Sequence, residues 1–193
     1  MRTLPAKRKK ASVSSTVILV VFILCAGLVI YYSMIRPSKE PKSTVTLYEE
    51  VTSRDLSKDY PQTPAEVAGV YCSIVKCMYT DDLTEDQLFT LCGQMRALYS
   101  RELLESNPIN DMLYRLEEEI DDFRDKDISI ASFVVEPAED VEYSVVGNKK
   151  RANVEFHFTL KGKAGTRLPE ELLLEEDEKR EFKIIGWRAH EGK

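Results

Sequence analysis

The sequence predicts an α+β protein with an N-terminal transmembrane helix, followed by a domain of three helices packed on one face of a curved antiparallel sheet. The span is predicted by 25 consecutive uncharged residues, from Ala11 to Ile35. Apolar residues then recur at helical spacing up to Phe123, and the period changes to two after Asp127. Because helices and strands are segregated along the chain, we expect helices on one face of the sheet and an open polar face.

The segment from Val13 to Ile35 is predicted to cross the membrane. It is long enough to span about 30 Å of hydrocarbon as a helix. No A-x-A-like cleavage site follows it, so we expect an uncleaved anchor rather than a signal peptide. Five basic residues precede the span, and the denser basic cluster stays inside. We therefore expect residues 1–12 to be a cytoplasmic tail of a single-pass cell-membrane protein, with the C-terminal domain extracellular.

Charge is unevenly distributed between the two parts of the chain. Residues 1–42 carry eight basic residues and one acid, +7, so the overall charge of −6 leaves −13 on residues 43–193. Nucleic acid should repel a domain this acidic, so no nucleic-acid partner is expected. Solubility is the ordinary explanation of such acidity, and a basic partner or cation binding is the sharper one.

Three cysteines outside the predicted span fall in helical patterns. Cys72 and Cys77 do not have a usual zinc spacing, and no histidine completes a metal set. We interpret these residues and Cys92 as small apolar side chains, with a disulfide from Cys92 as the alternative. No metal or cofactor is expected.

Residues 36–62 are predicted as a linker or arm, and residues 63–190 as the extracytoplasmic domain. The start of the linker carries proline, serine and lysine. Further along, Leu47, Val51 and Leu56 would either cover one side of a short helix or pack as an extended arm.

Capping residues mark the start of each predicted helix. Thr63 with Glu66 and Thr84 with Gln87 form capping boxes, and Asn107 precedes a proline. The predicted helices span residues 64–79, 85–105 and 108–124.

Alternation predicts the strands, which span residues 128–135, 141–146, 151–160, 171–176 and 181–189. Gly147-Asn148 suits a tight hairpin turn, and Pro169 should delay the fourth strand. A bulge at Gly186 would place Trp187 and Ala189 on the core face.

The third strand is the clearest in the sequence because apolar and polar residues alternate along all of it. Its predicted inward side chains are Ala152, Val154, Phe156, Phe158 and Leu160. Its outward side chains, a candidate contact surface, are Arg151, Asn153, Glu155, His157 and Thr159.

This element order, together with a final strand that reads Phe182-Lys183-Ile184-Ile185-Gly186-Trp187 after an acidic turn, resembles the NTF2-like (cystatin-like, cone-shaped) superfamily. The resemblance covers residues 63–189. Residues 60–108 are also similar to an uncharacterised family of single-pass membrane proteins from Gram-positive, Clostridia-type bacteria. That second similarity implies a location and a fold, without an activity.

The NTF2-like resemblance implies a conical pocket between the sheet and the helices. Enzymes that resemble ketosteroid isomerase or scytalone dehydratase place Asp, His or Tyr there, whereas the inward strand positions here are apolar. We find no nucleophile motif or phosphate-binding loop, so catalysis is not expected. The candidate pocket residues are Tyr71, Tyr99, Phe156, Phe158 and Trp187.

Three functions therefore compete. The first is a membrane-anchored, non-catalytic interaction module that contacts a protein partner, or a second copy, through its sheet face. The second is a small-ligand-binding or enzymatic domain that uses the pocket. The third is a structural component of a cell-envelope assembly. An open cavity that holds Tyr71 or Tyr99 with a buried carboxylate would favour the second function, and a filled interior would exclude it.

Overall fold

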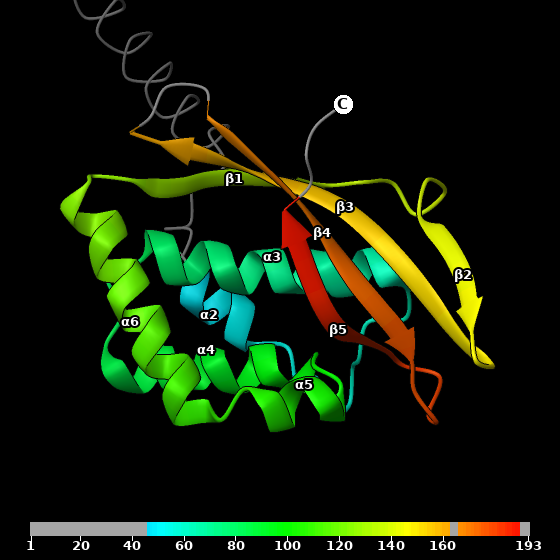
Figure 1. Ribbon diagram of the computed structural model, residues 1–193. Helices are drawn as coiled ribbons and strands as arrows, with labels where there is room; N and C mark the ends of the chain where they lie inside the picture. Colours follow the sequence, from blue (N-terminus) through cyan, green and yellow to red (C-terminus); the bar gives the residue numbers. More distant parts are fainter. Residues whose placement is uncertain (1–45, 163–165, 190–193) are drawn as a thin grey trace, which may run out of the picture. The chain divides into compact units, whose positions relative to one another are not determined.

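A computed structural model describes residues 46–162 and 166–189 (Figure 1). The chain separates into two compact units, residues 1–44 and residues 45–193, and the second contains everything described below. The predicted tail, the span from Val13 to Ile35 and the first part of the linker lie outside the described residues. Within the described part, no helix is both long and apolar enough to cross a membrane.

The described chain is α+β, with helices first and an antiparallel sheet after them, as predicted. The helices are α2 (Leu47–Thr52), α3 (Pro64–Thr80), α4 (Glu85–Ala97), α5 (Arg101–Ser106) and α6 (Ile109–Asp125). The strands are β1 (Ser129–Val135), β2 (Glu142–Val146), β3 (Lys149–Lys161), β4 (Arg167–Glu176) and β5 (Phe182–Ala189).

The sheet has the order β1-β3-β4-β5, and all its pairs are antiparallel. β2 pairs with the first part of the long strand β3, and β1 pairs with the later part. In Figure 1 all labelled helices lie on one side of the sheet, and β3 and β4 bend over them. The helices therefore cover one face, and the other face carries the polar side chains of β3.

The core forms where α3 packs against the inner face of the sheet. Alternate residues of β3 from Ala152 to Leu160 are buried, as the alternation predicts. Val67, Ile74 and Met78 supply the facing stripe of α3 and are almost fully buried. The three described cysteine thiols are free and buried, so they act as small core side chains.

The prediction of one helix over residues 85–105, and with it a total of three helices, is wrong. The chain leaves α4 after Ala97 and enters α5 at Arg101. In between, the Ile184 N–H donates to the Leu98 carbonyl at 2.8 Å, and the Ser100 N–H donates to the Ile184 carbonyl at 2.9 Å. Ser100 then caps α5 by accepting from the Leu103 N–H at 3.1 Å.

The prediction that Pro169 delays the fourth strand is also wrong, because β4 begins at Arg167. Pro169 pairs with His157 of β3, whereas the described part of β5 pairs with β4 only from Glu170 onward. The proline therefore lies where β4 has one neighbouring strand, a position that tolerates a missing N–H.

The predicted bulge in the last strand is present one residue early. Ile184 pairs with Leu174 and Gly186 pairs with Leu173, which leaves Ile185 as the extra residue. After the bulge Trp187 stands opposite the buried Leu172 on the core face, as predicted.

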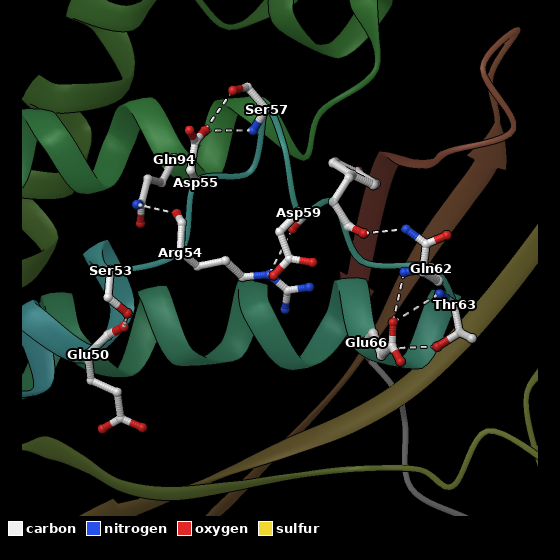
Figure 2. A network of polar contacts seen from close by, with 11 residues as sticks. Glu50, Ser53, Arg54, Asp55, Ser57, Asp59, Gln62, Thr63, Glu66 and Gln94 are labelled. Carbon is white, nitrogen blue, oxygen red and sulfur yellow. Dashed lines mark hydrogen bonds and ion pairs between the residues drawn. The ribbon is translucent and has the colours of Figure 1, made fainter.

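Residues before α3 form a short helix, one of the two arrangements expected for this segment. Figure 2 shows how polar contacts hold the connection from α2 to α3. Arg54 pairs with Asp59 at 3.1 Å, and the Gln94 amide of α4 donates to the Arg54 carbonyl at 3.4 Å. The Tyr60 hydroxyl donates to the Phe182 carbonyl at 2.8 Å. Residues 46–62, within the predicted linker, are thus packed against the domain.

Candidate functional site

A cavity of about 380 Å³ lies between α3, α6 and the inner face of the sheet. Ligand pockets typically measure about 300–1,000 Å³ and have mainly apolar walls with few polar groups. The lining residues are Tyr71, Val75, Tyr79, Met95, Tyr99, Asn107, Met112, Arg115, Leu116, Glu119, Phe123, Ile130, Phe158, Leu168, Glu170 and Trp187.

Four of the five candidate pocket residues, Tyr71, Tyr99, Phe158 and Trp187, line this cavity. Phe156 lies behind the wall, with its ring 6.0 Å from the Tyr71 ring and 5.4 Å from the Phe158 ring, both edge to face. The break between α4 and α5 matters here because it turns Tyr99 toward the sheet beside Ile184.

The hydroxyls of Tyr71 and Tyr99 are the first polar feature of the cavity. The two side chains are 7% and 5% exposed. Within the described part of the chain, neither hydroxyl has a hydrogen-bond partner, and neither hydroxyl oxygen is fully buried. Burial raises the pKa of both, so both stay protonated and able to donate. Both hydroxyls can donate a hydrogen bond to a polar group that enters the cavity.

Glu170 is the second polar feature, and sequence reasoning missed it. It lies on the inner face of β4 between Leu168 and Leu172, where burial raises the pKa of its carboxyl and the charge of Glu119 raises it further. The carboxyl makes no hydrogen bond or ion pair within the described residues. Alternation puts Glu170 on the apolar face only if β4 is extended back through Pro169, whereas the predicted strand began after that proline, at Glu171.

The mouth of the cavity carries both signs of charge. Arg115 and Glu119 are exposed side chains of α6, and the Arg115 guanidinium donates to the Asn107 side-chain carbonyl at 3.0 Å. Trp187 completes the mouth, with 46% of its surface exposed and its ring 6.1 Å from the Tyr99 ring.

The described lining of this cavity carries several kinds of polar group. It offers carboxyl, hydroxyl and amide groups, without a histidine or cysteine that would pair as nucleophile and base. Among residues 46–162 and 166–189, no group of three or more His, Cys, Asp or Glu side chains is arranged to hold a metal ion.

The candidate contact surface lies on the opposite face of the sheet. Its residues Arg151, Asn153, Glu155, His157 and Thr159 alternate with the buried row of β3. Arg151 pairs with Glu175 of β4 at 2.8 Å, and Arg188 of β5 pairs with Glu171. Ion pairs between neighbouring strands thus neutralise much of the charge on this face. Its role as a contact surface stays a prediction.

A second hollow of about 470 Å³ lies between the start of α5 and the turns that flank β3 and β5. Its lining is mainly charged, and Lys149 in it pairs with Glu175. It therefore lacks the mainly apolar wall of the first cavity.

The family model described as Domain of unknown function (DUF6715) matches residues 6–187, and the chain belongs to this family. Comparison with curated proteins and with solved structures found no match.

Proposed function

We propose that this member of the DUF6715 family is a non-catalytic, NTF2-like binding module that takes a small, mainly apolar molecule into its cavity. The observation that carries the proposal is the cavity itself, whose wall holds the buried side chains of Tyr71 and Tyr99, with hydroxyls that have no hydrogen-bond partner within the described residues.

The NTF2-like part of the proposal is supported by the arrangement of layers. Helices lie on one face of a bent antiparallel sheet, and the cavity opens between α3, α6 and that face. The bulge at Ile185 and the long pairing of β3 with β4 accompany the bend.

The location forms a further part of the proposal. The uncharged segment from Val13 to Ile35 and its basic N-terminal flank support a single-pass anchor with the cavity domain outside the cell. Such a module would collect its ligand at the outer surface of the membrane.

A protein contact through the sheet face is a second candidate function. Val134 of β1 stands beside His157 on this face and is 53% exposed, which favours some covering partner. We place this candidate second because Arg151 and Arg188 already form ion pairs within the sheet, so their charges are not free for a partner protein.

Filling the cavity tests the proposed function. Val75→Phe places a ring in the cavity from α3, and Val70→Phe is the matched control on the same helix outside the lining. Trp187, the single tryptophan of the chain, reports ligand entry from the mouth by its fluorescence. We expect para-tert-butylbenzyl alcohol to change the emission of the full-length wild type and Val70→Phe, and to leave Val75→Phe unchanged.

Far-UV circular dichroism confirms that both variants are folded. An equal response in Val75→Phe would show that the probe does not enter this cavity, and would contradict the proposal.

A further inference from the structure

We infer that the ligand of this cavity is an organic cation, with its ammonium group at Glu170 and its apolar body among the aromatic rings. The inference rests on the proposed function and specifies the ligand's chemical class. Three features of the described residues carry it: the ring-lined wall, the carboxyl without a counter-charge, and the charge of the whole domain.

The wall is unusually aromatic for its size. Tyr71, Tyr79, Tyr99, Phe158 and Trp187 all line the cavity. The faces of aromatic rings carry negative charge density and attract ammonium groups, most strongly where water is excluded. The Tyr71 and Tyr99 side chains are buried, so they meet this condition.

The carboxyl of Glu170 lacks a positive partner. Arg115 is the single cationic side chain in the described lining, and it is an exposed residue at the mouth that bonds to Asn107. Glu119 adds a second negative charge near Glu170, and both burial and this charge raise the pKa of Glu170. A bound ammonium group would supply the missing counter-charge and favour the ionised carboxyl.

The net charge of the domain also favours a cationic ligand. Residues 43–193 carry a formal charge of −13, which creates a negative potential that concentrates cations near the cavity mouth. An anionic ligand would meet this potential and two carboxyl groups. A neutral ligand would leave the charge of Glu170 unpaired or require its protonation.

Two probes of the same shape separate a cation from a neutral ligand. para-(Trimethylammonio)benzyl alcohol carries a nitrogen where para-tert-butylbenzyl alcohol carries a carbon, so they differ essentially in charge. Both are titrated into the full-length protein in one detergent, with Trp187 fluorescence as the readout. The proteins compared are the wild type, Glu170→Gln and Glu139→Gln, the last removing an equal charge at an exposed loop position outside the lining.

We expect Glu170→Gln to change the Kd of the cationic probe more than the Kd of the neutral probe. Glu170→Gln should raise the Kd of the cation about ten-fold, the size of a well-placed charge pair, while changing the Kd of the neutral probe less than about two-fold. Glu139→Gln should change both Kd values less than about two-fold. Partition into detergent cancels because each Kd is compared across variants for the same probe.

Equal weakening of both probes by Glu170→Gln, or no weakening of the cation, would overturn the cation inference. The proposed function would survive that outcome if Val75→Phe still abolished binding of the neutral probe. If Val75→Phe abolished binding of neither probe, the proposed function and the inference would both fail.

Discussion

At the scale of single residues, Glu170 is the residue on which the proposed ligand chemistry of the domain depends most. Its carboxyl projects from the apolar face of β4, where its neighbours along the strand face are Leu168 and Leu172. Tyr71, Tyr79 and Glu119 interact with it electrostatically from α3 and α6. Burial disfavours the charge of a carboxyl in such surroundings.

The stability of the protein should therefore depend on pH through Glu170. Its pKa in the folded state lies above the ordinary 4.5, so the folded state keeps its proton longer than the unfolded state does. The stabilising contribution is fully present below about pH 4.5 and is lost as pH rises through the folded pKa. Glu170→Gln should raise the Tm by about 2–4 °C at pH 7, with the difference from wild type shrinking toward pH 4.

Differential scanning calorimetry from about pH 4 to pH 7 measures this. Glu139→Gln is the control, since the exposed Glu139 carboxyl is outside the cavity. A Tm difference for Glu170→Gln that stays constant with pH would contradict the assignment.

At the scale of elements, the turn between α4 and α5 shapes the cavity. Leu98 and Ser100 bond to Ile184, and these bonds turn Tyr99 inward. Without the break, Tyr99 would continue the stripe of α4 and would not reach the ring of Trp187.

Ser100→Ala should loosen this turn. The substitution removes the hydroxyl that caps α5 and should cost about 1 kcal/mol, within the range measured for helix caps. Ser73→Ala is the control, because the Ser73 hydroxyl bonds to the Gly69 carbonyl inside α3 and alanine favours the helix. Urea denaturation should show a lower midpoint for Ser100→Ala and little change for Ser73→Ala. A Ser100→Ala midpoint equal to wild type would contradict the role given to the cap.

The elements predicted correctly are those with local causes. The capping boxes at Thr63 and Thr84 start α3 and α4 because their bonds span three residues. The alternation along β3 identifies its buried face because a period of two can be read from the residues of the strand itself, whichever strands lie beside it. The break after Ala97 could not be read from the sequence in this way, because its bonds go to Ile184, far along the chain, while Leu98 and Leu103 still keep helical spacing.

The residues of the candidate site divide in the same way, into those placed by a local sequence pattern and those placed by contacts between distant parts of the chain. Tyr71 and Trp187 were predictable because helix periodicity and a bulge place them. Glu170 was missed because the tolerance for Pro169 depends on how far β5 extends, which is a property of the assembled sheet.

At the scale of the whole molecule, the chain combines a described cavity domain with a segment whose composition predicts a membrane anchor. The folded unit begins before α3, because Tyr60 bonds to the Phe182 carbonyl and the Lys183 ammonium lies 3.7 Å from the Tyr60 ring centroid. Part of the predicted linker thus belongs to the folded unit.

The anchor can be tested on intact cells and their membranes. We expect the full-length protein to stay with the membrane pellet after alkaline carbonate extraction, and a deletion of residues 13–35 to release it. Protease added to intact protoplasts should degrade the domain if it is extracellular, with a cytoplasmic protein as the integrity control. Release of the full-length protein by carbonate would contradict the anchor, and protection from protease would contradict its orientation.

The bonds between Leu98, Ser100 and Ile184 have a further consequence for solubility. An open sheet edge invites a strand from another chain, which is a common start of aggregation. β5 is an edge strand of the described sheet, and the N–H and carbonyl groups of Ile184 are both used by the turn. The piece of chain that shapes the cavity wall thereby blocks strand addition at the middle of this edge.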